Sequence, residues 1–249
     1  MRKVLLVVGG ARGIGASVAK LAARRGYDLA ISYRERADRA HEVAHDVQAS
    51  GARALVFKAD VRDAEQVRRL FAETQASLGP LDAVVIAAGV TGRASPLAEA
   101  SPHVLQETID INVVGSILCA REAVLCMARS RGGHGGGIVF ISSGAATLGS
   151  AGEFVWYAAS KGAIDSLTRG LAIEVAGEGI RVNAVAPGLT LTELHEQSTG
   201  EAERATRLAP TVPLARAATS DEIAEPILWL LSDAASYVTG AVVRATGGR

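Results

Sequence analysis

Short apolar runs alternate along the chain with longer segments in which apolar residues recur every three or four positions. The runs with the length and composition of buried strands are 3–8, 28–33, 54–58, 82–87, 137–142, 180–186 and 241–245. Helical periodicity predicts helices near 13–25, 36–50, 64–78, 102–131, 157–177 and 220–232. Because the strands are apolar on both faces and helices separate them, the pattern predicts an α/β fold. In such a fold a parallel sheet is covered by helices on both sides.

Local capping signals support two of the predicted helix starts. Ser101-Pro102 is typical of a helix start, with Ser as the N-cap and Pro at the first helical position. The run Thr219-Ser220-Asp221-Glu222 has the spacing of a capping box, which predicts a helix that begins at Ser220. The chain contains no internal repeat, low-complexity tract or linker-like change of composition, so we expect one domain over residues 1–249.

The composition argues against several classes of function. Hydrophobic residues make up 49% of the chain and charged residues 21%, a balance that can bury a large core. The 26 basic and 26 acidic residues cancel, so the chain lacks the net basic charge expected of a protein that binds nucleic acid or an anionic membrane. The opening apolar run is too short for a signal peptide, and no run approaches the roughly 20 apolar residues of a membrane span. We therefore expect a cytoplasmic protein.

The cysteines and histidines do not form a pattern typical of a disulfide framework or a metal site. Cys119 and Cys126 lie seven residues apart, which is two turns on one helix face, and this favours two reduced thiols. His41 and His45 are four apart on a predicted helix, where a solvated pair is far commoner than a zinc site. We therefore predict no metal site.

A glycine-rich loop follows the first predicted strand and opens the first helix. It has the sequence Gly9-Gly10-Ala11-Arg12-Gly13-Ile14-Gly15. Glycines at such a position let the backbone turn tightly and approach a pyrophosphate, whose charge then meets the helix N-terminus. The strand–loop–helix context favours a nucleotide-binding loop over the alternative, a plain turn between a strand and a helix.

Tyr157 and Lys161 lie four residues apart in the stretch EFVWYAASKGA. On a helix this spacing places both side chains on one face. An ammonium beside a phenol favours the phenolate, so Lys161 is expected to lower the pKa of Tyr157 from its ordinary value of about 10. The pair is therefore a candidate acid/base, although a surface tyrosine beside a solvated lysine has the same spacing.

Together, these motifs resemble the short-chain dehydrogenase/reductase family. The glycine spacing, Gly-x-x-x-Gly-x-Gly, and the run Tyr-Ala-Ala-Ser-Lys carry most of the resemblance, which extends over the whole chain. The further matching pieces are Asp60-Val61, Ala88-Gly89, Asn112, Ser142-Ser143, Pro187-Gly188 and Tyr237-Val238-Thr239-Gly240. The local sequence is similar to bacterial glucose-dehydrogenase-like and 3-oxoacyl-reductase-like oxidoreductases. The resemblance implies a Rossmann-like fold, a doubly wound parallel sheet of seven strands with helices on both faces.

The resemblance also implies the reaction, a hydride transfer between a nicotinamide cofactor and a carbonyl or secondary alcohol substrate. Tyr157 would be the general acid/base, and Lys161 would lower its pKa and hydrogen-bond the nicotinamide ribose. Ser143, the second serine after its strand, would hold the substrate oxygen, with Ser142 as the alternative. Asn112 would kink its helix and hold a water that links Lys161 to solvent, or its amide would be satisfied within the helix.

The same resemblance implies which cofactor is bound. Arg34 directly follows the strand ending at Tyr33, and with Arg12 it would flank a 2′-phosphate, so NADP(H) is preferred and NAD(H) is possible. Glu35 supports the alternative, because an acidic residue near this point binds the ribose hydroxyl of NAD. The implied cofactor-binding residues are Gly9, Arg12, Gly13, Ile14, Gly15, Tyr33, Arg34, Asp60, Val61, Ala88, Gly89, Tyr157, Lys161, Pro187, Gly188, Thr190 and Thr192.

The chain departs from the family pattern at several places around the implied cleft. Val8 replaces a threonine before the first glycine, and Ile86-Ala87-Ala88-Gly89 replaces the run Asn-Asn-Ala-Gly. Ser143 lies one residue further from Tyr157 than is usual, so we expect an extra residue in the loop 152–155. The resemblance implies that residues 189–212 close over the substrate, with Leu191, Leu194 and His195 near it, and leaves the substrate itself open.

The family resemblance also bears on partners and on alternative functions. Members assemble through helices that correspond to 102–131 and 157–177, so we expect a homotetramer or a homodimer. Some relatives keep the fold and the cofactor but act as sensors or regulators, typically after losing the tyrosine or the lysine. Because Tyr157 and Lys161 are both present, we favour an NADP(H)-dependent carbonyl reductase or alcohol dehydrogenase acting on a small molecule.

Overall fold

The computed structural model describes residues 2–249, except for the side chain of His195, and builds them around a parallel sheet. The strand order is β3-β2-β1-β4-β5-β6-β7, and every neighbouring pair is parallel. The strands are β1 (Lys3–Val8), β2 (Tyr27–Tyr33), β3 (Ala54–Lys58), β4 (Ala83–Ile86), β5 (Gly136–Ile141), β6 (Ile180–Pro187) and β7 (Val242–Ala245). The order reverses direction between β1 and β4, and in open α/β sheets ligands bind outside the carboxyl ends of the strands at that point.

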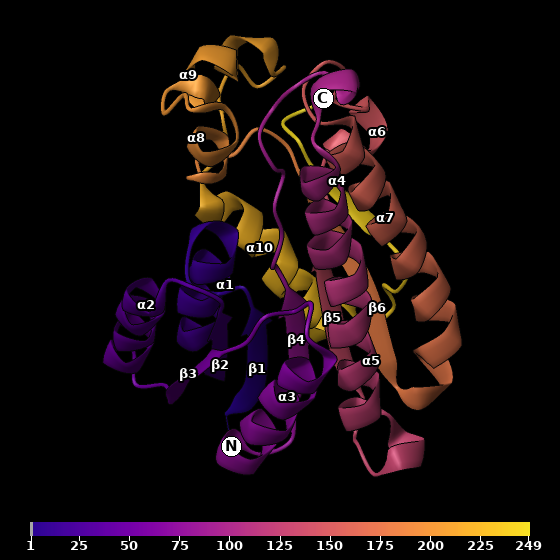
Figure 1. Cartoon of the computed structure of the whole chain (residues 1–249). Coiled ribbons are helices and arrows are strands. Elements are labelled where there is room, and N and C mark those ends of the chain that lie inside the picture. The colour runs from indigo at the N-terminus through magenta and orange to yellow at the C-terminus, as the bar shows by residue number, and fades with distance from the viewer. Residues whose placement is uncertain (1) are drawn as a thin grey trace.

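Helices cover both faces of the sheet (Figure 1). The longer helices are α1 (Gly13–Arg24), α2 (Ala37–Ala49), α3 (Ala64–Leu78), α4 (Pro102–Ile109), α5 (Gly115–Met127), α7 (Val155–Val175) and α10 (Ser220–Leu231). Buried residues of α1, α2 and α10 pack on one face, and those of α3, α5 and α7 pack on the other. The Rossmann-like fold predicted from the sequence is therefore confirmed.

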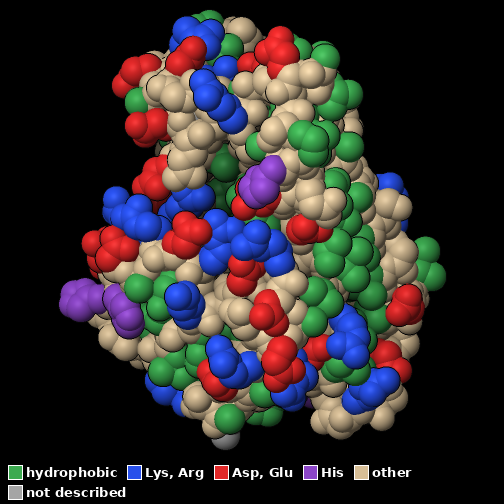
Figure 2. Space-filling model, in the orientation of Figure 1, with side chains coloured by type: hydrophobic (Ala, Val, Ile, Leu, Met, Phe, Trp, Pro, Cys, Tyr) green, Lys and Arg blue, Asp and Glu red, His purple; other side chains and the backbone are tan. Residues whose placement is uncertain are grey.

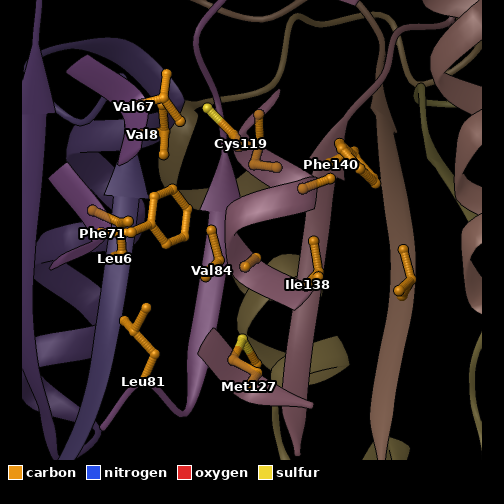
Figure 3. Close-up of a cluster of buried hydrophobic side chains, with 14 of the residues drawn as sticks. Leu6, Val8, Val67, Phe71, Leu81, Val84, Cys119, Met127, Ile138 and Phe140 are labelled. Carbon is orange, nitrogen blue, oxygen red and sulfur yellow. The ribbon is translucent and has the colours of Figure 1, made fainter. Parts of the chain in front are cut away.

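The two faces of β1 show how the apolar runs build two cores. Val4, Leu6 and Val8 belong to the core beneath α3, α5 and α7, whereas Leu5 and Val7 belong to the core beneath α1, α2 and α10. Figure 3 shows the first of these cores, in which Phe71 and Phe140 lie among aliphatic side chains and Met127. Burying a side chain of this size contributes roughly 1.5–3 kcal/mol relative to leaving it exposed. The sheet is therefore held from both sides.

The strand boundaries predicted from the sequence agree with the structure to within one residue. Both capping predictions are confirmed. The Ser101 side chain accepts a hydrogen bond from the Val104 amide, and Thr219 and Glu222 form a capping box. The helix predicted near 102–131 runs without a break from Pro102 to Met127 and so ends four residues earlier than predicted, and it contains a π-helical segment, Asp110–Val114, between α4 and α5.

Three short helices near the carboxyl edge of the sheet were not predicted. They are α6 (Ala145–Leu148), α8 (Leu194–Thr199) and α9 (Arg204–Leu208). Each has six residues or fewer, and isolated helices of this length have too few hydrogen bonds to offset nucleation without tertiary contacts. Figure 1 shows α8 and α9 projecting above the sheet, over the carboxyl ends of the strands.

Candidate active site

A cleft of about 1070 Å³ opens along the carboxyl ends of the strands. This is the upper end of the range for ligand pockets, with room for a large cofactor and a small substrate together. Its walls come from the loops that follow β1 to β6, and its roof from the segment that carries α8 and α9. Figure 2 shows a hollow below that segment, bordered by Lys/Arg and Asp/Glu side chains.

The glycine loop forms one wall of the cleft, and its glycines are required by close backbone contacts. Gly9 has φ of +82°, and a Cβ added there would lie 2.7 Å from the backbone nitrogen of Ala88. A Cβ on Gly15 would lie 2.3 Å from the carbonyl oxygen of Gly9. The loop backbone therefore packs directly against itself and the loop after β4, and the N-terminus of α1 faces the cleft.

The two serines after β5 both border the cleft but make different contacts. Ser142 is buried, and its hydroxyl donates a hydrogen bond to Asp165 of α7. Ser143 lines the cleft, its hydroxyl accepts a hydrogen bond from the Ala145 amide, and its presence lowers the pKa of the Tyr157 phenol. The geometry therefore favours Ser143 over Ser142 as the serine that can reach a ligand.

Tyr157 and Lys161 share one face of α7, as their spacing predicted, and both line the cleft. The ammonium of Lys161 lies 5.6 Å from the centre of the Tyr157 ring and donates a 2.7 Å hydrogen bond to the carbonyl oxygen of Ile141. Burial lowers the pKa of Lys161 to about 8, and Asp165 acts in the opposite direction.

The sequence predicts a lowered pKa for Tyr157, whereas in the structure the pKa of Tyr157 is raised. Burial raises the pKa of the Tyr157 phenol, and the hydrogen bond with Ser143 only partly offsets this. Lys161 does not reverse the direction because its ammonium is bonded to the carbonyl oxygen of Ile141 rather than to the phenol oxygen. At neutral pH the phenol is therefore protonated, which is the form that can donate a proton.

Asn112 lies behind the cleft wall, in the π-helical segment between α4 and α5. Its side-chain nitrogen donates to the Val90 carbonyl and to the Ser160 hydroxyl, and its oxygen accepts from the Val90 amide. The helix is thus irregular at Asn112, as expected, and the amide is satisfied by groups outside that helix. A Cβ added to Gly89 would lie 3.3 Å from Oδ1 of Asn112 and 3.5 Å from Nζ of Lys161, so Asn112 and Lys161 are neighbours.

Charged side chains gather where β1 and β2 end. Arg34 lines the cleft and pairs with Glu35, with 2.6 Å between Nη2 and Oε1. Arg12 also lines the cleft, and its Nη1 lies 3.7 Å from Oε2 of Glu193. Asp60, after β3, forms a bidentate pair with Arg62 that keeps the pKa of the Asp60 carboxyl below its ordinary value. Two arginines therefore lie at the end of the cleft where the sequence predicts a 2′-phosphate.

Nearly all the residues implied by the family resemblance meet in this one cleft. Thr192 lies against the glycine loop, because a Cβ on Gly13 would be 3.5 Å from its methyl group. Leu194 lines the cleft, whereas Leu191 is half exposed and lies outside it, and the side chain of His195 lies outside the described residues. The cleft is lined by Gly9, Arg12, Gly13, Ile14, Gly15, Tyr33, Arg34, Asp60, Val61, Ala88, Gly89, Ser143, Tyr157, Lys161, Pro187, Gly188, Thr190 and Thr192.

Sequence reasoning missed the ion pair in the roof of the cleft. Arg204, in α9, is nine-tenths buried and hydrogen-bonds Glu153, four residues before Tyr157. Its guanidinium carbon lies 6.0 Å from the centre of the Phe154 ring. Backbone bonds from Ala94 to Ser198 and from Ser95 to Glu153 tie the same loops together. No short-range signal marks these residues, because they come from three separate segments.

The described part of the chain offers neither a metal site nor a membrane span. Among the described side chains, no group of three or more His, Cys, Asp or Glu residues could hold a metal ion. Within residues 2–249, no helix is long and apolar enough to cross a membrane. Cys119 and Cys126 are free, and burial raises their thiol pKa values to about 12 and about 11, so both are protonated at neutral pH.

Comparison with known proteins agrees with the fold and the cleft. A sequence model of the enoyl-(acyl carrier protein) reductase family matches residues 9–249. The uncharacterized oxidoreductase YgfF of Escherichia coli (strain K12) is 44% identical over 246 residues, which is 99% of both chains. The short-chain dehydrogenase/reductase of Serratia marcescens BCRC 10948 superposes with a TM-score of 0.90 at 33% identity, covering 99% of this chain and 97% of that one. A short-chain dehydrogenase from Burkholderia cenocepacia J2315, solved in complex with NADP, superposes with a TM-score of 0.91 at 31% identity, with the same coverage.

The fold and the cleft are those of an oxidoreductase built to hold a dinucleotide. Both the match over residues 9–249 and the relatives that cover nearly the whole chain point to one family. The chain belongs to the short-chain dehydrogenase/reductase family.

Proposed function

We propose that this protein is an NADP(H)-dependent oxidoreductase that interconverts a carbonyl compound and a secondary alcohol, with Tyr157 as the general acid/base. The observation that carries this proposal is that Ser143, Tyr157 and Lys161 line the same cleft as the glycine loop. A proton-transferring phenol and a loop suited to a dinucleotide therefore lie within reach of one bound substrate.

The residues present fit a nicotinamide dinucleotide. The contacts of Gly9 and Gly15 leave the loop without side chains that would keep a pyrophosphate away from the N-terminus of α1. Asp60 and Val61 line the part of the cleft where an adenine would lie, and Pro187 and Gly188 line the opposite part. When bound, the cofactor would supply or accept the hydride at the substrate carbon.

The side chains of this protein would supply the proton and hold the substrate oxygen. Tyr157 is protonated at neutral pH and would donate its proton to the carbonyl oxygen during reduction, a form of assistance worth typically about 10²–10⁴ in rate. Ser143, which lines the cleft and acts on the Tyr157 phenol, would donate to the same oxygen. Lys161 would hold positive charge beside the phenol and thereby stabilise the phenolate that proton transfer leaves.

The charge at the adenosine end supports NADP(H) over NAD(H). Arg12 and Arg34 both line the cleft, and guanidinium groups match the charge and geometry of a phosphate. Glu35, the residue that would favour NAD, has its carboxylate engaged by Arg34. Both arginines are partly exposed and can reorient toward a ligand.

Turnover with a panel of ketones and aldehydes tests this function and separates the two serines. We expect NADPH oxidation with at least one carbonyl compound, faster than with NADH at equal concentration. Ser143→Ala should lower kcat/KM by about 10-fold or more, because the substrate oxygen loses a hydrogen bond made in the transition state. Ser142→Ala, which removes a hydroxyl bonded to Asp165, is the matched control and should retain most of the activity. If Ser142→Ala loses turnover and Ser143→Ala does not, the assignment is wrong.

A further inference from the structure

Glu193 links the segment that carries α8 and α9 to the phosphate end of the cleft. It directly precedes α8, and its carboxylate lies 3.7 Å from Nη1 of Arg12 and 3.9 Å from Nη2 of Arg39. The neighbouring Thr192 lies against the glycine loop at Gly13. The carboxylate of Glu193 therefore lies between two guanidinium groups, at the place where Arg12 lines the cleft.

The arginines around this end of the cleft are each paired with a carboxylate. Arg34 is bonded to Glu35, and Arg36 forms a bidentate pair with Asp38 at 2.9 and 3.1 Å. Glu35 and Asp38 are close in sequence to the arginines they bind, and Arg34 also lies 3.7 Å from Glu107 of α4. Glu193 is the partner of Arg12 and comes from the segment over the cleft, more than 150 residues away from Arg12 in the sequence.

We infer that Glu193 sets the preference of this protein between NADPH and NADH by competing with the 2′-phosphate for Arg12. A bidentate hydrogen bond from the Arg12 guanidinium to a phosphate would replace the ion pair that Arg12 makes with the Glu193 carboxylate. The carboxylate that is displaced remains nearby and repels the phosphate, which carries the same sign of charge. NADH has no 2′-phosphate, so its binding does not require this exchange. The inference rests on the cofactor proposed above.

The expected size of the effect follows from the exposure of the pair. The side chains of Arg12 and Glu193 are 37% and 45% exposed, so the pair is screened by water and salt. Removing the charge of Glu193 should therefore tighten NADPH binding by about 3- to 10-fold at low ionic strength. This range is expected because the variant loses both the exposed ion pair with Arg12 and the repulsion between the Glu193 carboxylate and the 2′-phosphate. The gain should shrink as salt is added.

Direct binding measurements test the inference without any substrate. The dissociation constants of NADPH and NADH would be measured by cofactor fluorescence for the wild type, Glu193→Gln and Glu196→Gln. Glu196 lies in α8, three residues after Glu193, with its side chain exposed, so it controls for a general loss of negative charge. We expect Glu193→Gln to bind NADPH 3- to 10-fold more tightly with no change for NADH, and Glu196→Gln to change neither by more than about 2-fold.

The outcomes separate this inference from the proposed function. Equal tightening of NADPH and NADH in Glu193→Gln would overturn the inference, because it would show an effect unrelated to the phosphate. No change for either cofactor would overturn it too. If the wild type binds NADH as tightly as NADPH, the proposed cofactor preference fails, but the ratio of the two affinities in Glu193→Gln still decides the role of Glu193.

Discussion

Lys161 carries its charge in the cleft wall with only 5% of its surface exposed. Burial disfavours the ammonium, and two features oppose that cost: the 2.7 Å hydrogen bond to the Ile141 carbonyl and the negative charge of Asp165, one turn along α7. The hydroxyl of Ser142 donates to Asp165 and so helps to fix its position. Ser142 lies at the wall of the cleft, but its hydroxyl is bonded to Asp165 and not to Tyr157 or Lys161 side-chain atoms.

Asp165→Asn should move the alkaline limb of the pH–rate profile to lower pH. The pKa of Lys161 is about 8, and Asp165 raises it, so loss of that negative charge lowers it further. Lys161 is charged below its pKa, and the variant therefore loses the ammonium at a lower pH than the wild type. The profile of kcat/KM against pH measures this, with Glu174→Gln, an exposed position on the same helix, as the control. An alkaline limb that stays in place in Asp165→Asn would show that Asp165 does not tune Lys161.

The glycine loop illustrates how far the sequence defines an element. Its position between a strand and a helix, and the spacing of its glycines, were predictable because backbone turns and close approaches have strong residue preferences. The seven strands were predictable for a similar reason, since a sheet buried on both faces needs apolar runs. The π-helical segment at Asn112 was not, because it depends on hydrogen bonds to Val90 in another loop.

The roof of the cleft depends on tertiary contacts more than the glycine loop does. The pair of Arg204 with Glu153 joins segments 51 residues apart, and periodicity carries no information about such a contact. The same is true of the direction of the Tyr157 pKa shift. Spacing predicted Lys161 as a neighbour of Tyr157, but the burial that raises the pKa of the phenol comes from the packed surroundings of α7.

Gly15→Ala should weaken both the fold and cofactor binding. The added Cβ would lie 2.3 Å from the Gly9 carbonyl oxygen, so the loop must shift, at a cost of about 1–3 kcal/mol in the free energy of unfolding. Thermal unfolding with and without NADPH measures both effects, and we expect the stabilisation by NADPH to fall sharply. Gly177→Ala is the control, because a Cβ there meets nothing within 4 Å. Unchanged stabilisation by NADPH in Gly15→Ala would contradict the role proposed for the loop.

At the scale of the whole molecule, apolar side chains remain exposed on the outer surfaces of helices α5 and α7, which face away from the sheet. Ile117 of α5 is 45% exposed and Ile173 of α7 is 82% exposed. Figure 2 shows hydrophobic side chains along the flank that carries α4, α5 and α7. Exposed apolar patches of this kind mark surfaces that associate with another protein, and the family resemblance implies these helices as the site of self-assembly.

We expect the protein to form a homotetramer, or at least a homodimer, through these helices. Light scattering at micromolar concentration measures the assembled mass directly. Ile117→Lys or Ile173→Lys should shift the mass toward smaller species, because a charge would be buried without a partner at the interface. Both residues are exposed in the single chain, so folding should be retained, as judged by circular dichroism. A wild-type protein that is monomeric at this concentration contradicts the prediction.

The central claim is that Tyr157 exchanges a proton with the substrate oxygen in a cleft that binds a nicotinamide cofactor. Tyr157→Phe removes one oxygen from a side chain that is otherwise retained, so NADPH affinity and thermal stability should stay close to those of the wild type. Turnover of a carbonyl substrate found for the wild type should fall by about 10²–10⁴-fold. Full turnover in Tyr157→Phe, with NADPH binding intact, would contradict the account, because the proton would then come from another group.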